Sequence, residues 1–282
     1  MLNLLRVLPK ATMTRMAGRL TASPFSRRFL PWFCRHYNID WQEASLPPEQ
    51  YPSIQAFFCR ELKPGARPID EDRSSVVSPV DATVAQCGPI QDGLLLQAKG
   101  QTYTVADLLA DRQEAKRYEG GWYVTLYLGP RDYHRIHSPA DGTVRNTTYV
   151  PGSLWPVNRE AVGRIPRLFA RNERLITYLD TPEFGRLAIV KVGACMVGGI
   201  HVTYDAALRA THKRGPVEHR CYPHPHAMQK GEQLGRFEFG STVILLAEPG
   251  PWTLQPGLAA DAAVRMGEPL ARLRTTTSDS AD

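Results

Sequence analysis

The sequence predicts an α+β protein in which short amphipathic helices precede a β-rich core. From residue 74 onward, short runs of β-branched and aromatic residues are separated by Gly, Pro and Asp, as in residues 121–129, 186–204 and 241–248. In the first forty residues, apolar and basic positions instead recur with helical spacing. We therefore expect few long helices and a core that resembles a sandwich or barrel.

The N-terminal region holds most of the positive charge. The formal net charge of the chain is +6. The first 38 residues contain no acidic residue and seven basic ones: Arg6, Lys10, Arg15, Arg19, Arg27, Arg28 and Arg35. Pro9, Pro24 and Pro31 divide this segment into short helices. A basic amphipathic segment with Trp and Phe suits an anionic membrane surface, on which it lies without crossing. Packing on the protein's own core and a mitochondrial targeting peptide are the alternatives.

A boundary is expected near residue 70, because residues 45–70 indicate a loop, a short helix and a turn-rich exit. We predict a membrane-associating helical region over residues 1–70 and a β-rich catalytic core over residues 71–282. Within the core, SPVDATV at residues 78–84 is echoed by SPADGTV at residues 138–144. Each is a turn that leads into a strand, which suggests a duplicated β unit. Residues 166–175 form either a helix or an extended loop.

Cysteine usage argues against a disulfide framework or a zinc ribbon. The five cysteines are scattered and include no CxxC pair, so a reducing compartment is the simpler interpretation. Cys221, His224 and His226 are close together, but a proline-rich loop is favoured over a metal site. No apolar run approaches the roughly 18 residues that span a bilayer. We expect no metal and no nucleic-acid partner.

Ser241 is the first candidate for chemistry. It follows Gly240 and precedes a run of β-formers. A serine hydroxyl can attack the carbonyl of the preceding residue if a base removes its proton and donors hold the oxyanion. The resulting ester can break by β-elimination, leaving dehydroalanine that hydrolyses to a pyruvoyl group. An ordinary turn into a strand is the alternative.

His134 and His137 lie three residues apart and could supply the base, since neutral imidazole suits this role at physiological pH. Asp81 could orient a histidine and stabilise its charged form. Taken alone, each of these residues is more simply explained by a structural role.

Seven segments taken together resemble the phosphatidylserine decarboxylase family. They occur in the family's order and cover most of the chain: residues 51–70, 76–84, 127–142, 151–158, 172–174, 192–200 and 230–243. The histidine segment and the segment that contains Gly-Ser-Thr are the most specific.

The resemblance implies a proenzyme that cleaves itself between Gly240 and Ser241. Asp81, His137 and Ser241 match the family's self-processing triad, with His137 as base and Asp81 as its orienter. Cleavage would leave one chain of residues 1–240 and another of residues 241–282. The second chain would begin with a pyruvoyl cofactor derived from Ser241. His134 matches the histidine that the family uses in decarboxylation, where it handles the proton at the substrate's Cα.

The implied reaction converts phosphatidylserine to phosphatidylethanolamine. The substrate amine would form a Schiff base at the pyruvoyl group, which accepts the electrons released with CO₂. The expected partners are phosphatidylserine, an anionic membrane surface and the two chains as a heterodimer, with a higher homo-oligomer left open. We expect a bacterial-type enzyme, peripheral on the cytoplasmic face of the inner membrane. The alternatives are a pyruvoyl decarboxylase of a soluble amino acid, a non-enzymatic lipid-binding module and a serine hydrolase.

Two residues depart from the family's pattern. Phe239 replaces the usual leucine, for which we expect a reshaped pocket and intact processing. Ala82 stands where glycine is usual, which tests whether that turn needs a positive φ.

Overall fold

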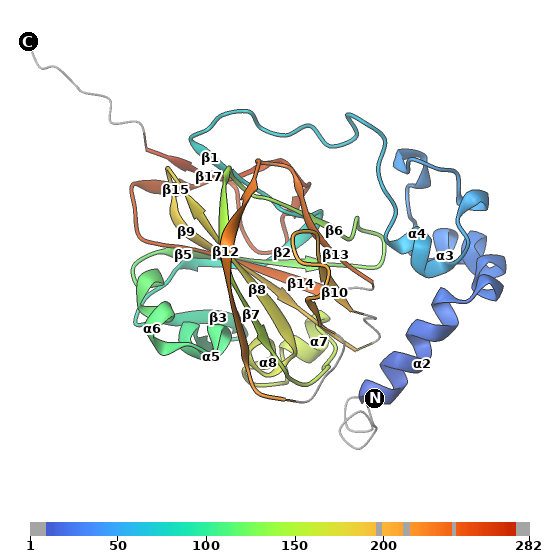
Figure 1. Ribbon diagram of the computed structural model, residues 1–282, viewed down its shortest axis with the longest axis horizontal. Helices are drawn as coiled ribbons and strands as arrows, with labels where there is room; N and C mark the ends of the chain where they lie inside the picture. Colours follow the sequence, from blue (N-terminus) through green and yellow to red (C-terminus); the bar gives the residue numbers. More distant parts are fainter. Residues whose placement is uncertain (1–9, 196–198, 211–214, 239–240, 275–282) are drawn as a thin grey trace, which may run out of the picture.

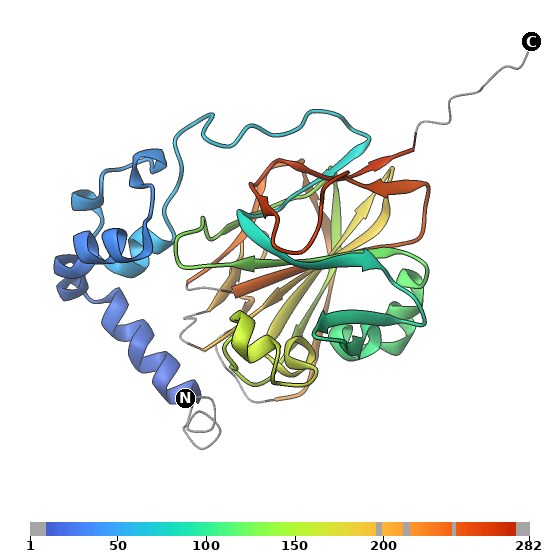
Figure 2. The same ribbon diagram turned by 180° about the vertical axis from the view of Figure 1, so that it is seen from behind.

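The computed structural model describes residues 10–195, 199–210, 215–238 and 241–274. Short helices gather at the N-terminal end and around one face of a β-rich core, and the long link after α4 crosses to the first strand (Figures 1 and 2). The predicted α+β class is confirmed. The described strands form several antiparallel sheets and close no barrel.

The helical elements are short, and most precede or flank the sheets. The α-helices are α2 (Lys10–Ala22), α3 (Leu30–Tyr37), α4 (Ile54–Phe58), α5 (Val105–Leu109), α6 (Arg112–Ala115), α7 (Arg159–Val162) and α8 (Leu168–Arg171). The 3₁₀ helices are η1 (Pro24–Phe29), η2 (Trp41–Glu43), η3 (Pro48–Gln50) and η4 (Lys116–Tyr118).

The described strands run as follows: β1 (Ser75–Val77), β2 (Ala82–Pro89), β3 (Leu94–Ala98), β4 (Gln101–Thr104), β5 (Trp122–Leu128), β6 (Arg135–His137), β7 (Gly142–Val150), β8 (Arg174–Thr181), β9 (Gly185–Val192), β10 (Ile200–Val202), β11 (Arg209–Ala210), β12 (Glu218–Met228), β13 (Gln233–Phe237), β14 (Ser241–Ala247), β15 (Trp252–Leu254), β16 (Ala263–Val264) and β17 (Pro269–Leu273). Residues 166–175 contain the short helix α8 and the start of β8, so the helical alternative holds for part of that segment.

Local sequence accounts for the helix ends near the N-terminus. Helix α2 ends before Pro24, and Pro31 occupies the first turn of α3, where a missing N–H costs nothing. Ser53 caps α4 by accepting the backbone N–H of Ala56 at 3.1 Å. The predicted division of this segment into short helices is confirmed around Pro24 and Pro31, while Pro9 lies outside the described residues.

An eight-stranded sheet forms the centre of the core, in the order β12-β7-β8-β9-β14-β5-β2-β16. Two smaller sheets, β1-β17-β15 and β11-β10-β13-β6, accompany it, together with the β3-β4 hairpin. Strand β14 pairs with β9 on one side and β5 on the other, and all seven of its residues are buried. It is therefore an interior strand.

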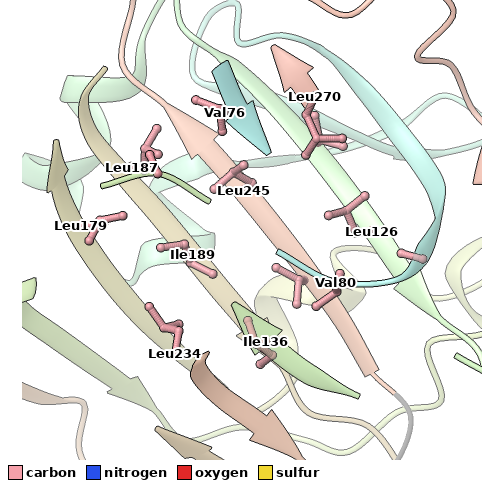
Figure 3. Packing of buried hydrophobic residues seen from close by; sticks show 14 of the residues in the cluster. Val76, Val80, Leu126, Ile136, Leu179, Leu187, Ile189, Leu234, Leu245 and Leu270 are labelled. Atoms are coloured by element: carbon pink, nitrogen blue, oxygen red, sulfur yellow. The ribbon is translucent and has the colours of Figure 1, made fainter. Parts of the chain in front are cut away.

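Each face of the large sheet covers its own hydrophobic core. Along β14, Val243 and Leu245 pack into a cluster that includes residues of the smaller sheets, which Figure 3 shows. Ile244 and Leu246 alternate to the opposite face and pack with residues of α5, α7 and α8. The sheet is thus sandwiched between short helices and the smaller sheets.

The two repeated segments noted in the sequence form equivalent turns that bond to each other. The Val77 N–H donates to the Pro139 carbonyl at 2.9 Å, and the His137 N–H donates to the Pro79 carbonyl at 2.8 Å. In each segment the serine hydroxyl donates to the carbonyl two residues later, at 2.7 Å in the first and 2.8 Å in the second. This reciprocal pattern supports the predicted duplicated unit.

Ala82 is compatible with its turn because that turn does not require a left-handed residue. Neither Ala82 nor its counterpart Gly142 is among the residues with positive φ. At Gly142 a Cβ would lie 2.7 Å from the carbonyl oxygen of Asp180, so glycine is needed there for space. The departure at Ala82 therefore carries no backbone strain.

The N-terminal region has a hydrophobic cluster of its own, formed by residues between Leu30 and Phe58. The division at residue 70 stays a prediction. No helix in the described ranges is long and apolar enough to cross a membrane.

Candidate active site

Ser241 begins β14 and is fully buried. Its Oγ has no hydrogen-bond partner in the described part of the chain. A buried hydroxyl without a partner is costly, and the hydroxyl of the neighbouring Thr242 shares this property. Gly240 and Phe239 lie outside the described residues.

The pairing of strands brings His134 close to the same place. Ser241 lies opposite Leu128 at the end of β5, and the Phe237 N–H at the end of β13 donates to the His134 carbonyl at 3.0 Å. Ser241 therefore begins a strand that pairs with β5, and His134 directly precedes a strand, β6, that pairs with β13.

His134 is a neutral base with an unoccupied nitrogen. Its Nδ1 lies 2.8 Å from the Asp132 carbonyl, which can only accept, so Nδ1 carries the proton and Nε2 the lone pair. Burial lowers the pKa of His134 to about 3. Nε2 has no partner within the described ranges. The imidazole is therefore neutral throughout the physiological pH range, with its lone pair on Nε2.

His137 lies at the end of β6, and both of its ring nitrogens are occupied. Nδ1 donates to the Gly231 carbonyl at 2.7 Å, and Nε2 accepts from the Tyr133 hydroxyl at 3.1 Å. Burial raises the pKa of Tyr133 to about 12, which keeps that hydroxyl protonated. Burial also lowers the pKa of His137. This histidine too is held as the neutral form with its lone pair on Nε2.

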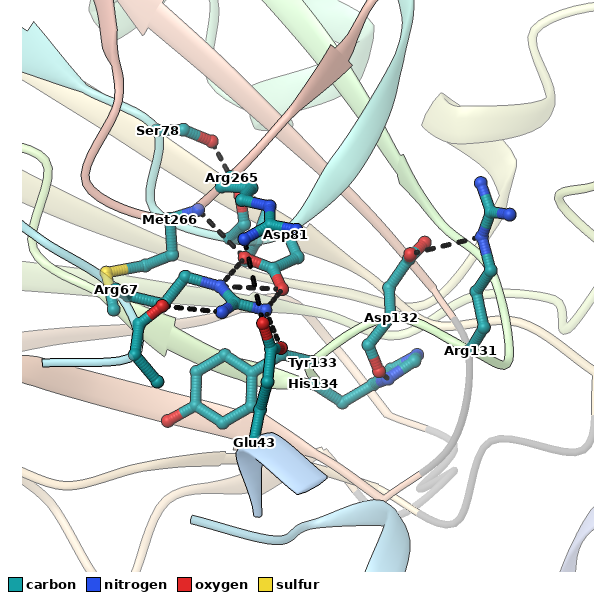
Figure 4. Close-up of polar contacts among 12 residues, drawn as sticks. Glu43, Arg67, Ser78, Asp81, Arg131, Asp132, Tyr133, His134, Arg265 and Met266 are labelled. Atoms are coloured by element: carbon teal, nitrogen blue, oxygen red, sulfur yellow. Dashed lines mark hydrogen bonds and ion pairs between the residues drawn. The ribbon is translucent and has the colours of Figure 1, made fainter. Parts of the chain in front are cut away.

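Asp81 accepts from a buried arginine and from the backbone (Figure 4). The Arg67 guanidinium donates to it from Nε at 2.9 Å and from Nη2 at 2.6 Å, and the Met266 N–H donates at 2.9 Å. Arg67 also bonds to Glu43 at 2.7 Å, which ties the N-terminal region to the core. Asp81 is thus held rigidly with its negative charge balanced.

The predicted site residues lie on neighbouring turns, but they do not form a hydrogen-bonded triad in this structure. No hydrogen bond or ion pair among the described residues joins Asp81 to His137, or joins either histidine to Ser241. Asp81 instead pairs with Arg67, and the Gly231 carbonyl orients His137. The catalytic roles of these residues stay predictions.

The N-terminal region packs directly against the histidine-bearing loop. The Phe58 and His134 rings lie 3.9 Å apart between centroids. The Arg135 Nε donates to the Cys59 carbonyl at 3.0 Å, and the Cys59 thiol donates to the Phe237 carbonyl at 3.3 Å. The site therefore lies where the helical region meets the core.

Comparison with known proteins gives the family of this arrangement. The family model described as "Phosphatidylserine decarboxylase" matches residues 54–272. The chain belongs to the phosphatidylserine decarboxylase family. Among similar curated proteins, the "Phosphatidylserine decarboxylase proenzyme" of Brevibacillus brevis is 45% identical over 269 residues, covering 95% of this chain and 96% of that protein. The protein of the same name from Myxococcus xanthus is 46% identical over 271 residues, covering 95% of this chain and 96% of that protein.

The sequence of this phosphatidylserine decarboxylase family member did not identify three buried or partly buried residues that the structure draws attention to: Arg67, Tyr133 and Glu173. Arg67 and Tyr133 lie within matched segments, but nothing in their spacing indicates that they contact Asp81 and His137. Glu173 is also buried, and its Oε1 accepts from the Tyr149 hydroxyl at 2.6 Å. A Cβ on Gly193 would lie 3.6 Å from Glu173 Oε2, so this carboxylate lies beside the residue that follows β9, the strand next to β14.

Within the described ranges no group of three or more His, Cys, Asp or Glu side chains could hold a metal ion. Cys221, His224 and His226 lie along the edge strand β12, so the expected proline-rich loop is wrong; the segment is a strand whose register shifts between Cys221 and His226.

Proposed function

We propose that this protein is a pyruvoyl-dependent phosphatidylserine decarboxylase that first cleaves its own chain between Gly240 and Ser241. The observation that carries the proposal is the Ser241 hydroxyl, which is buried and has no partner among the described residues. Family membership and the word proenzyme in the relatives' names support a self-processing step.

In the processing step, the Ser241 hydroxyl attacks the carbonyl carbon of Gly240, and the peptide nitrogen leaves as the amine of Ser241. The chain is then held as an ester on Oγ. Removal of the Ser241 α-proton expels the ester oxygen, which leaves a carboxylate on Gly240 and dehydroalanine at position 241. Hydrolysis of the dehydroalanine releases ammonia and gives the pyruvoyl group.

We assign the base in this step to His137. The Gly231 carbonyl fixes its tautomer, so Nε2 is the nitrogen that accepts the proton. Burial opposes the imidazolium that forms, and the negative charge of Asp81 favours it. Since the Tyr133 hydroxyl donates to Nε2, it must turn away or relay the proton for His137 to act.

Decarboxylation is assigned to the processed Ser241 position together with His134. Ser241 fits a self-derived group because its side chain is enclosed at the start of a fixed interior strand. A pyruvoyl group supplies an electron sink for loss of CO₂ from an amine-linked substrate. We assign the handling of the proton at the substrate's Cα to His134, whose Nε2 has no partner among the described residues. The Phe58 ring beside it helps to exclude water.

The two chains produced by cleavage would stay together as a heterodimer. Residues 241–274 supply β14, which lies between β9 and β5 in the large sheet, and also β15, β16 and β17. Release of the short chain would leave the facing edges of β9 and β5 unpaired and would expose both adjoining cores.

Membrane association is proposed through the N-terminal helices. Most exposed large apolar side chains of the described chain lie in this region, including Leu20 (70% exposed), Phe25 (61%) and Trp32 (54%). Exposed arginines lie among them at positions 15, 19, 27, 28 and 35. Apolar residues interspersed with cations suit an anionic bilayer surface. We place the protein on the cytoplasmic face of a bacterial inner membrane, as its resemblance implies.

The function is tested by incubating the purified protein with vesicles that contain phosphatidylserine and measuring phosphatidylethanolamine and CO₂. We expect equal amounts of both products, and none from a Ser241→Ala variant. Free serine serves as the competing substrate. Decarboxylation of serine but not of the lipid would favour the soluble-substrate alternative, and activity in Ser241→Ala would refute a role for this residue.

A further inference from the structure

Arg60 is a buried cation that the proposed mechanism leaves unused. It lies just after α4 and is only 4% exposed. Its Nη2 donates to the Arg131 carbonyl at 3.3 Å, while Nε and Nη1 have no acceptor in the part of the chain that the structure describes. Three of the five N–H donors of this guanidinium are therefore unsatisfied.

A second buried arginine shows how the fold satisfies such a group when its role is structural. Arg174 is 2% exposed and likewise has no carboxylate partner in the described ranges. Its Nε, Nη1 and Nη2 donate to four backbone carbonyls at 2.6 to 2.9 Å. Arg60 lacks an equivalent set of acceptors, although its guanidinium lies 5.0 Å from the centre of the Phe57 ring.

Arg60 lines a cavity of about 260 Å³ between the N-terminal region and the core. The acidic residues lining this cavity already accept hydrogen bonds from the protein: Asp40, Glu43, Asp81 and Asp132. The other lining arginines each pair with one of these carboxylates: Arg67, Arg131 and Arg265. Arg60 is thus the lining arginine that makes no ion pair in the described ranges, although the nearby negative charge of Asp81 favours its charged form. A buried unpaired charge is strongly unfavourable unless an anion joins it.

The cavity adjoins the proposed chemistry. Arg60 bonds to the carbonyl of Arg131, three residues before His134 on the same loop. Phe58, two residues before Arg60, contacts the His134 ring. A ligand that reaches from His134 Nε2 toward this guanidinium would carry an anion a few bonds from its reacting carbon.

We propose that Arg60 binds the phosphodiester of the substrate headgroup. This inference rests on the proposed function, in which the substrate is phosphatidylserine. Three bonds separate the reacting Cα of that headgroup from phosphorus, so one short ligand can engage both groups. Arginine suits phosphate because its planar donors match the phosphate oxygens.

The substrate carboxylate is the less suitable partner for Arg60. A cation held against that carboxylate would stabilise the charge that disappears when CO₂ leaves, and so would oppose the reaction. The phosphodiester keeps its charge from substrate to product. Binding of the phosphodiester by Arg60 would stabilise the ground state and the transition state equally. Arg60 should therefore affect KM more than kcat.

The kinetic test uses Arg60→Gln and Arg60→Lys, with Arg174→Gln as the buried-arginine control and dihexanoyl phosphatidylserine as a soluble substrate. Intact mass first establishes that each variant has processed. We expect Arg60→Gln to process and to raise KM by about tenfold or more, with kcat changed less than about twofold. Arg60→Lys, which keeps the charge, should raise KM less. An unchanged KM in Arg60→Gln, or loss of processing in both Arg60 variants, would overturn the inference.

A binding test separates the phosphodiester from free phosphate and does not require turnover. Glycerophosphoethanolamine, ethanolamine and inorganic phosphate are titrated calorimetrically into uncut Ser241→Ala protein, with and without Arg60→Gln. We expect glycerophosphoethanolamine to bind more tightly than ethanolamine or phosphate, and the preference to disappear with Arg60→Gln. Tighter binding of inorganic phosphate than of the phosphodiester would contradict a substrate subsite. A wild-type protein that does not decarboxylate phosphatidylserine refutes the proposed function, whereas an active wild type with an unaltered Arg60→Gln variant refutes only this inference.

Discussion

Asp81 and Asp141 occupy equivalent positions in two copies of one turn. Asp81 accepts the backbone N–H of Met266 at 2.9 Å, and Asp141 accepts that of Lys230 at 2.8 Å. Only Asp81 is also held by a buried arginine, Arg67. The turn with Asp141 therefore has the backbone hydrogen bond alone. The turn with Asp81 has the same hydrogen bond and also an ion pair with Arg67 beside the predicted site.

This pairing supplies a matched test of Asp81. Asparagine keeps an acceptor for the backbone N–H but removes the charge. We expect Asp81→Asn to destabilise the protein by about 3–5 kcal/mol, because it leaves Arg67 partly unpaired in a buried site, and to slow self-cleavage. Asp141→Asn should cost about 1 kcal/mol or less and process normally. Thermal unfolding and the fraction of cleaved chain, measured for both variants, check this prediction. Equal processing by the two would remove Asp81 from the processing machinery.

The two histidines should separate into two phenotypes. We expect His137→Gln to remain one chain, since the base for Ser241 is lost. His134→Gln should cleave itself but lose turnover by roughly 10²–10⁴-fold, the usual contribution of a general acid–base group. Mass spectrometry reports the first property and product formation the second. Since His134 has the unoccupied Nε2, the reverse result would mean that the two roles must be exchanged.

Acid should destabilise the protein partly through His134. Its pKa is about 3 in the folded state, against 6.5 for an ordinary histidine, so the unfolded chain binds the proton first as pH falls. This stability is present above pH 6.5 and is lost progressively toward pH 3, with a slope of up to about 1.4 kcal/mol per pH unit. His137, whose pKa is also lowered, adds a change of the same sign.

The free energy of unfolding should therefore vary less with pH below 6.5 in His134→Gln than in the parent protein. Denaturant titrations in a Ser241→Ala background keep the comparison to one uncut chain. Parallel pH profiles for the two proteins would show that His134 does not contribute to the acid sensitivity.

Membrane binding should depend on the exposed apolar residues of the N-terminal region. Replacing Phe25, Phe29 and Trp32 by serine should abolish sedimentation with anionic vesicles, while added salt should weaken binding of the wild type. Each arginine near the surface contributes about 1 kcal/mol. Serine at Leu94 and Leu96, which are exposed on β3, serves as the control. Equal loss in both variants would argue against a specific N-terminal contact.

Local sequence predicted most elements because their signals are local. Pro24 and Pro31 divide the N-terminal helices, and the repeated segments at residues 78–84 and 138–144 form equivalent turns. The β-rich core followed from short β-branched runs between turn residues. The order of strands could not be predicted in this way, because the placement of β14 between β5 and β9 depends on contacts between distant parts of the chain.

Sequence predicted less of the site than of the fold, because the contacts of the site residues also depend on distant parts of the chain. Ser241, His134, His137 and Asp81 could be named from motifs, but their hydrogen-bond partners could not. The Gly231 carbonyl at His137 is a backbone group without a sequence signal, and the Arg67 pairing with Asp81 joins the link before β1 to the turn before β2. Arg60 is recognisable only when its burial and its missing acceptors are seen together.

Self-cleavage at Ser241 is the central claim, and the intact mass of the purified protein under denaturing, reducing conditions tests it most directly. We predict two chains, residues 1–240 and 241–282, with the shorter chain lacking a free amine and reacting with phenylhydrazine. Ser241→Ala should remain a single chain of full mass. A wild-type protein that also remains uncut would contradict the account.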